Sequence, residues 1–165
     1  MLKPIKQKYF RMKKMLQLFP YCLLFLFVAC HQANFYETNT ALVNRSWSYQ
    51  DKPSFEVKIA DNKAKYDVYI NARHTAEYNY SNLFFLLHLK GPQLLDSAFR
   101  YEAKLAELDG RWIGKNAGNL YFNEIMVKKD LVFPDTGVYT FAIEQNMREN
   151  PLKHISDVGI KLVKK

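Results

Sequence analysis

Cysteine is scarce in this sequence, which has two, Cys22 and Cys30, among 165 residues. Cys22 lies inside an apolar stretch near the N-terminus, and Cys30 closes that stretch. If the stretch is a cleaved leader, Cys22 is removed with it and Cys30 becomes the first residue of the mature chain. No thiol is then left for a disulfide, a CxxC redox site or a thiolate nucleophile. We therefore expect the mature domain to be held together by packing alone.

A hydrophobic run long enough to span a membrane is also lacking. The N-terminal run from Met15 to Ala29 has 15 residues and includes Gln17 and Pro20, whereas a transmembrane helix needs about 20 apolar residues. Six cations precede the run, and the sequence Leu26-Phe27-Val28-Ala29-Cys30 ends it. This arrangement predicts a lipoprotein signal peptide over residues 1–29. Plain cleavage and an uncleaved anchor are the alternatives.

Cys30 is the predicted lipidation site, carrying diacylglycerol on its thiol and a further acyl chain, such as palmitate, on its freed amine. Each buried acyl methylene contributes about 0.8 kcal/mol, so two or three chains on one residue form a durable anchor. We expect contact with the membrane through this lipid alone. The predicted organisation is a signal peptide over 1–29, a lipidated tether over 30–45 and one β-domain over 46–165.

An excess of positive charge is absent from the mature chain, although the whole sequence has 24 Lys and Arg against 16 Asp and Glu. Six of the cations and none of the acids precede Cys30, which leaves 18 against 16. The basic character of the sequence therefore belongs mostly to the leader, and nucleic acid is not an indicated partner.

Motifs for catalysis or metal binding are missing as well. The four histidines are scattered and show no H-x-x-H or H-E-x-x-H spacing, and the sequence has no G-x-S-x-G elbow, P-loop or dinucleotide fingerprint. Three carboxylates, Glu102, Glu144 and Asp157, fall on different predicted strands, so the sequence nominates no acid–base pair. We predict no enzyme activity, no metal and no cofactor other than the covalent lipid.

Alternation of apolar and polar residues is what the sequence does contain. Phe55, Val57 and Ile59 alternate with Glu56 and Lys58, and similar patterns recur along the chain. The predicted strands are a first one near residue 47, then 54–60, 66–72, 83–89, 97–105, 120–127, a strand around 139–143 and a last one around 158–162. Short strands at regular spacing predict an all-β fold, an antiparallel β-sandwich of the jelly-roll or Ig-like type with about eight strands.

Three local features refine this prediction. The turn Asp61-Asn62-Lys63 has hairpin chemistry and predicts that strands 54–60 and 66–72 are neighbours. The run 83–89 is apolar on both faces, which is typical of a central strand covered on both sides. The glycine-rich segment Gly114–Gly118 is expected to be a turn.

Aromatic residues in or near the predicted loops raise a second function. Their rings either stack on sugar faces or fill the sandwich core; they are Trp47, Tyr78, Tyr80, Trp112 and Tyr121. The alternative to a protein-binding role is therefore a glycan-binding envelope lipoprotein. Arg148 and Asp157 flank the last loop, 146–154, where we expect them to pair.

Several spaced motifs resemble the GldH gliding-motility lipoproteins of Bacteroidota, over essentially the whole mature chain. They are Tyr80-Ser81-Asn82-Leu83-Phe84, Gly110-Arg111-Trp112-Ile113-Gly114, Phe133-Pro134 with Gly137-Val138-Tyr139, Gln145-Asn146-Met147-Arg148-Glu149-Asn150, and Asp157-Val158-Gly159. The resemblance implies a lipid-anchored envelope protein needed for gliding, a process linked in that phylum to type IX secretion. It implies no catalytic residues and makes other gliding and secretion proteins the expected partners.

The candidate partner-binding residues are Trp112, Asn146, Arg148, Glu149 and Asp157. Separately, Asp96-Ser97-Ala98 resembles the Asp-Ser/Thr-apolar acceptor of the O-glycosylation system of Bacteroidota, which makes Ser97 a candidate glycosylation site. Surface-exported lipoproteins of this phylum carry acidic residues just after the cysteine, but here the first acid is Glu37. We therefore predict an outer-membrane protein whose domain faces the periplasm.

Overall fold

The computed structural model describes residues 35–165, which form an all-β domain with one 3-10 turn. Within this range eight strands have six or more residues, and three are shorter. Their bounds are β1 Tyr36–Ala41, the turn η2 Val43–Arg45, β2 Ser46–Trp47, β3 Ser54–Ile59, β4 Tyr66–Thr75, β5 Asn82–Lys90, β6 Ser97–Lys104, β7 Lys115–Ala117, β8 Leu120–Leu131, β9 Gly137–Gln145, β10 Leu152–Lys153 and β11 Ile155–Lys164.

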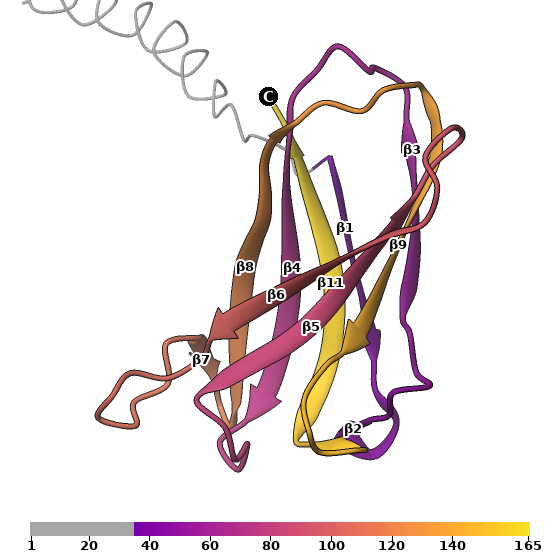
Figure 1. Cartoon of the computed structure of the whole chain (residues 1–165). Coiled ribbons are helices and arrows are strands. Elements are labelled where there is room, and N and C mark those ends of the chain that lie inside the picture. Colours follow the sequence, from indigo (N-terminus) through magenta and orange to yellow (C-terminus); the bar gives the residue numbers. More distant parts are fainter. Residues whose placement is uncertain (1–34) are drawn as a thin grey trace, which may run out of the picture. The chain divides into compact units, whose positions relative to one another are not determined.

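Two antiparallel sheets pack face to face (Figure 1). One has the order β1-β11-β4-β8-β7 and the other the order β3-β9-β5-β6, while β2 and β10 form a separate short pair. If the eight long strands are numbered along the chain, the sheets read 1-8-3-6 and 2-7-4-5. This is the strand order of a jelly roll, so of the two sandwich types that the sequence left open, the structure has the first.

The long strands pair in a nested way. β5 pairs with β6, β4 with β8, β3 with β9 and β1 with β11. Only the innermost pair consists of strands that follow each other in the chain. The sandwich is therefore a long antiparallel ribbon that is folded over on itself, and its core forms only when distant segments meet.

The core lies between the two sheets and is built from the apolar half of each alternating strand. Phe55, Val57 and Ile59 are buried on β3, whereas Glu56 and Lys58 between them are exposed. The same holds for three other runs that the alternation predicted, on β4, β9 and β11: Tyr66, Val68 and Ile70; Tyr139, Phe141 and Ile143; and Val158, Ile160 and Leu162. The predicted all-β sandwich is thus confirmed.

The predicted hairpin between residues 54–60 and 66–72 is wrong. β3 and β4 lie in different sheets, and the segment between them crosses from one sheet to the other. The turn chemistry itself is present, because Asp61 Oδ1 accepts hydrogen bonds from the backbone N–H groups of Lys63 and Ala64 at 3.0 and 3.2 Å. Such a turn fixes the local backbone but does not decide which strand pairs with which.

The tether was predicted over residues 30–45, but the folded domain already includes part of that range. Residues 36–41 form β1, which pairs along its whole length with β11, so the folded domain begins before residue 46. Mostly polar and exposed, β1 has the composition expected of an edge strand, and for that reason its sequence resembles a linker. The predicted signal peptide and Cys30 lie outside the described residues.

Two further expectations are only partly correct. β5 lies inside its sheet as expected, but only one face is fully buried; Phe84, Leu86 and His88 on the other face are half-buried. The glycine-rich segment is a hairpin, in which β7 pairs with the start of β8 around a turn with Gly118 at φ 70°. No helix within residues 35–165 has the length and apolar character to cross a membrane.

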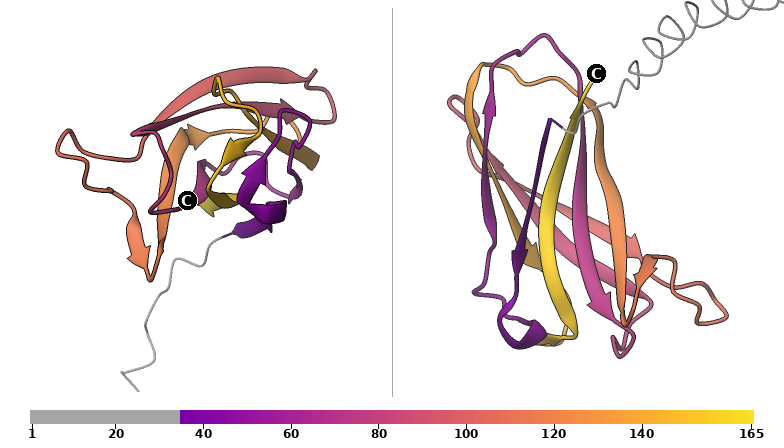
Figure 2. Two further views of the ribbon diagram at one scale, coloured as in Figure 1. Left: turned by 90° about the horizontal axis from the view of Figure 1, so that it is seen from below. Right: turned by 180° about the vertical axis from the view of Figure 1, so that it is seen from behind.

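The two ends of the sandwich carry different segments (Figures 1 and 2). At one end lie the β3–β4 connection, the C-terminus and Phe35, where the described chain begins; Lys164 pairs with Asp61 at 2.9 Å there, and the rings of Phe35 and Tyr66 are 5.3 Å apart. At the opposite end lie the β4–β5 and β9–β10 loops and the β2–β10 pair. The candidate functional site lies at this second end.

Candidate functional site

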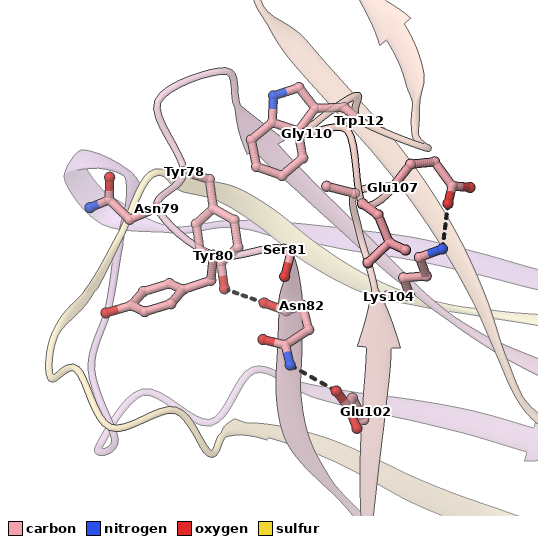
Figure 3. A pocket seen from close by; sticks show the side chains of 12 residues that line it. Tyr78, Asn79, Tyr80, Ser81, Asn82, Glu102, Lys104, Glu107, Gly110 and Trp112 are labelled. Carbon is pink, nitrogen blue, oxygen red and sulfur yellow. Dashed lines mark hydrogen bonds and ion pairs between the residues drawn. The ribbon is translucent and has the colours of Figure 1, made fainter.

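Two loops at this end enclose a hollow of about 440 Å³. They are the β4–β5 loop, residues 76–81, and the β6–β7 loop, residues 105–114, and the neighbouring ends of β5 and β6 complete the wall (Figure 3). The backbone N–H groups of Leu105 and Ala106 donate to Ser81 O at 2.8 and 3.0 Å, which ties the two loops together. The two loops that line the hollow are therefore fixed relative to each other.

A row of aromatic rings links these loops to the β9–β10 loop. The ring centroids of Trp112 and Tyr78 are 6.3 Å apart, and those of Tyr78 and Tyr80 are 5.6 Å apart. Tyr80 then donates its hydroxyl hydrogen to Glu149 Oε2 at 2.8 Å. The structure thus brings Trp112 and Glu149, two of the candidate residues, together at one end of the sandwich through two tyrosines.

Gln145 holds the β9–β10 loop from inside. Its side chain is completely buried; Nε2 donates to Glu149 O at 3.1 Å and to Trp47 O at 3.4 Å, and Oε1 accepts from Met147 N at 2.8 Å. Tyr49 adds a hydrogen bond from its hydroxyl to Met147 O at 2.6 Å. Each of these polar groups is satisfied without water, so the loop has a fixed shape.

The motif at residues 145–150 therefore divides into two sets. Gln145 and Met147 are buried and shape the loop, whereas Asn146 and Arg148 are exposed. Asn146 Oδ1 accepts a hydrogen bond from Arg100 Nε at 2.9 Å, and the Arg100 guanidinium lies 4.2 Å above the ring of Phe84. Arg148 is the exposed cation of this loop, and it forms no ion pair within residues 35–165.

Asp157 does not join this surface, and the predicted pair with Arg148 is wrong. Asp157 lies on β11 and pairs instead with Arg73 on the neighbouring strand β4, with 3.2 Å between Oδ2 and Nη1. The register places the two residues directly opposite each other, which the sequence does not reveal. Burial raises the pKa of the Asp157 carboxyl above its ordinary value, and the charge of Arg73 partly offsets this.

The remaining sequence candidates are distributed elsewhere. Ser97 begins β6 and is half-buried, with its hydroxyl donating to Leu95 O at 3.2 Å; its glycosylation stays a prediction. Glu102 accepts a hydrogen bond from Asn82 at 2.7 Å, and Glu144 pairs with Lys52 at 2.8 Å. The hydrogen bond from Lys52 is the main reason that the pKa of Glu144 is lowered. Within the described residues no group of three or more His, Cys, Asp or Glu side chains is arranged to hold a metal ion.

The idea of an exposed aromatic platform needs correction. Trp47 is fully buried and Tyr78 nearly so, and both belong to the core. Trp112 and Tyr80 are only half-buried and line the hollow, together with the amides of Asn79 and Asn82. Sequence reasoning could not separate these two groups, because an aromatic ring in a loop serves a core as readily as a surface.

His74 lies beneath the aromatic row. It is fully buried on β4, its Nδ1 contacts Thr75 O at 2.8 Å, and its Nε2 has no hydrogen-bond partner. The rings of Trp112, Tyr78 and Tyr121 lie 4.5, 5.4 and 5.5 Å from it. Desolvation disfavours the charged imidazolium and lowers the pKa of His74, although the contact with Thr75 O partly opposes this.

This burial predicts a pH-dependent stability. Because the folded-state pKa of His74 lies below the unfolded value of about 6.5, the unfolded chain binds the proton more readily. The free energy of unfolding should therefore fall as the pH is lowered from about 6.5 toward the folded-state pKa. Urea unfolding between pH 7.5 and 5 measures this. We expect His74→Gln to flatten the dependence and His154→Gln to retain it; an unchanged slope in His74→Gln would contradict this assignment.

Gln145 is the residue of this site that sequence reasoning missed, although a signal for it existed. It continues the inward-facing series Tyr139, Phe141 and Ile143 at the same spacing of two. A polar side chain at an inward position must find hydrogen-bond partners, so the pattern indicates a residue that anchors a neighbouring loop.

Comparison with known proteins adds an independent finding. A family model described as GldH lipoprotein matches residues 34–162. A protein of Christiangramia forsetii named gliding motility lipoprotein GldH homolog is 28% identical over 148 residues, covering 86% of this chain and 90% of its own. The gliding motility lipoprotein GldH of Flavobacterium johnsoniae is 25% identical over 130 residues, covering 74% and 80% respectively. The matched region contains every loop of the site.

Proposed function

Because the chain belongs to the GldH lipoprotein family, we propose that it is a lipid-anchored, non-catalytic protein of the cell envelope that supports gliding motility and the associated type IX secretion machinery. The observation that carries this proposal is the match over residues 34–162 together with relatives named for gliding motility. In this proposal the domain acts by contacting other envelope proteins.

The contact surface that we propose is the end of the sandwich formed by the β6–β7 and β9–β10 loops. Arg148 and Asn146 project from a loop whose backbone is already held by Gln145 and Tyr49. A loop that is ordered before binding loses little conformational entropy on contact, which favours affinity. Arginine is also enriched among the residues that dominate binding energy at protein interfaces.

The position of this surface suits an anchored protein. The described chain begins at Phe35, at the end of the sandwich opposite the proposed surface. Cys30 precedes Phe35 by five residues, a segment that spans at most about 18 Å when extended. We propose that the lipid holds the domain close to the outer membrane on its periplasmic side, with the proposed surface facing away from the bilayer.

Removing the acylated residue tests this function. We expect deletion of the gene to abolish colony spreading and to reduce secretion of type IX substrates, because the proposed contacts are lost. Wild type should restore both traits, whereas Cys30→Ala should not, since the domain then leaves the membrane. Colony diameter and the secreted proteome are measured together. If the deletion leaves both traits intact, the proposal fails.

A glycan-binding role is the second candidate, and the hollow favours it. Trp112 and Tyr80 supply half-buried rings, and Asn79, Asn82 and Glu102 supply polar groups beside them. Rings combined with a few convergent polar groups are typical of small-ligand sites. We favour the protein-contact role over the glycan-binding role because it also accounts for the exposed residues of the β9–β10 loop.

A further inference from the structure

The strand β8 has a free edge along most of its length. β7 pairs only with Leu120, Tyr121 and Phe122 at its beginning, and no other strand of residues 35–165 pairs with the same side of β8 from Asn123 onward. The views in Figures 1 and 2 agree that β8 lies at the margin of its sheet with only the short β7 beyond it. A free edge presents unpaired N–H and C=O groups, which can pair with another strand.

Gly114 is the point where the chain leaves this edge. A Cβ on Gly114 would lie 2.9 Å from the side-chain amide of Asn123 and 2.9 Å from Phe122 O, so only glycine passes there without displacing a neighbour. The preceding residue turns away from β8, because Ile113 N donates to Leu105 O at 2.8 Å. The place that a longer β7 would occupy beside Glu124 and Ile125, beyond Gly114, is thus left open.

A hollow of about 330 Å³ lies at this place. Its apolar wall consists of Ile113, Phe122 and Ile125, and Ile113 is 45% exposed. Met126, on the same face of β8 as Phe122, is 47% exposed. The hollow therefore offers room for an apolar side chain directly beside an unpaired strand edge.

The C-terminal part of β8, around Lys128 and Asp130, is protected against strand addition, but the part that follows Phe122 is not. The register with β4 shifts around Lys128, and Asp130 has a φ of 52°, so the backbone is irregular there. Bulges of this kind are a common defence of exposed edges. Residues 123–126 pair with β4 without a shift, and Val127 marks the start of the irregular part between Met126 and Lys128.

The charges around this segment are mostly positive. Lys115 and Lys104 line the hollow, and Lys104 is already paired with Glu107. Lys128 lies just beyond the hollow with its Nζ 4.2 Å above the Phe99 ring. The lining also contains an acid, Glu124, which is already paired with Lys161 at 2.8 Å. A second copy of this chain would bring the same lysines into contact, which disfavours self-pairing. The chain's own residues 31–34 contain no acid and therefore do not match this charge either.

We propose that the edge of β8 over Asn123–Met126 accepts an extended acidic segment of a partner protein as an additional strand. Main-chain hydrogen bonds to β8 supply affinity, as in other cases of strand addition. An apolar side chain of the segment enters the hollow at Ile113, and neighbouring carboxylates meet Lys115 and Lys128. This binding mode goes beyond the gliding role and does not depend on it.

A synthetic peptide tests the proposal. The probe is a fluorescent hexapeptide of alternating valine and glutamate, titrated into the acylated mature protein in detergent and followed by anisotropy. We expect saturable binding. N-methylation of alternate amides should weaken it about tenfold or more, because several main-chain hydrogen bonds are lost. A peptide with lysine in place of glutamate should not bind.

Two matched variants locate the binding. Lys115→Glu should weaken binding of the acidic peptide, whereas Lys58→Glu, an exposed lysine on the edge strand β3 of the other sheet, should leave it unchanged. Thermal melting verifies that both variants fold. The proposal is overturned if the acidic peptide does not bind, if N-methylation has no effect, or if the two variants weaken binding equally. Light scattering that shows a dimer lost in Lys115→Glu would assign the edge to a second copy instead.

Discussion

Replacement of Trp47 by alanine is expected to lower the free energy of unfolding by about 3–5 kcal/mol. The Trp47 side chain is fully buried, and its Nε1 donates to Asp51 O at 2.8 Å. Its backbone pairs with Leu152 across the β2–β10 pair, and its carbonyl accepts from Gln145. Loss of the indole leaves a cavity at the base of the β9–β10 loop. Chemical denaturation followed by far-UV circular dichroism measures the change.

Trp112→Ala provides the matched comparison. The second tryptophan is only half-buried and packs on His74 from one side, so its removal should cost about 1–2 kcal/mol. The two tryptophans look alike in the sequence, where both lie near predicted loops. Equal losses, or a larger loss for Trp112→Ala, would contradict the packing described here.

The strands of this fold are readable from the sequence, but their partners are not. Alternation places Phe55, Val57 and Ile59 on one buried face because side chains point to opposite sides of a strand. Nothing in the alternation says that β3 pairs with β9, some eighty residues later. Turn chemistry at Asp61 favoured the nearer strand, and the nested pairing of a jelly roll overrides that local preference.

The candidate site shows the same limit. Trp112 and Glu149 were both candidate partner-binding residues, and the structure connects them through Tyr78 and Tyr80. Asp157 was expected beside Arg148 because both flank one loop in the sequence. Its true partner, Arg73, lies opposite it in the β4–β11 register, and a register follows from the packing of the whole sheet.

Charge reversal at Arg148 is expected to abolish colony spreading without unfolding the protein. Arg148 is exposed, and it makes no ion pair within residues 35–165, so its replacement should change the free energy of unfolding by less than about 0.5 kcal/mol. At a protein interface, loss of a central arginine costs about 2 kcal/mol or more, roughly a thirtyfold loss of affinity. A glutamate in its place also puts a negative charge where a partner that binds arginine is complementary to a positive one.

Lys63→Glu is the control for this change. Lys63 is an exposed cation in the β3–β4 connection, at the opposite end of the sandwich, and its replacement alters the net charge by the same amount. A general effect of charge on export or solubility would appear in both variants. An effect of the proposed contact surface would appear only in Arg148→Glu.

The most direct test of this account is therefore the colony spreading of a deletion strain complemented with wild type, Arg148→Glu or Lys63→Glu, at matched protein levels in the membrane fraction. We predict full spreading for wild type and Lys63→Glu and none for Arg148→Glu, with the same melting temperature for all three proteins. Normal spreading of Arg148→Glu would contradict the claim that the β9–β10 loop is the surface through which this lipoprotein acts.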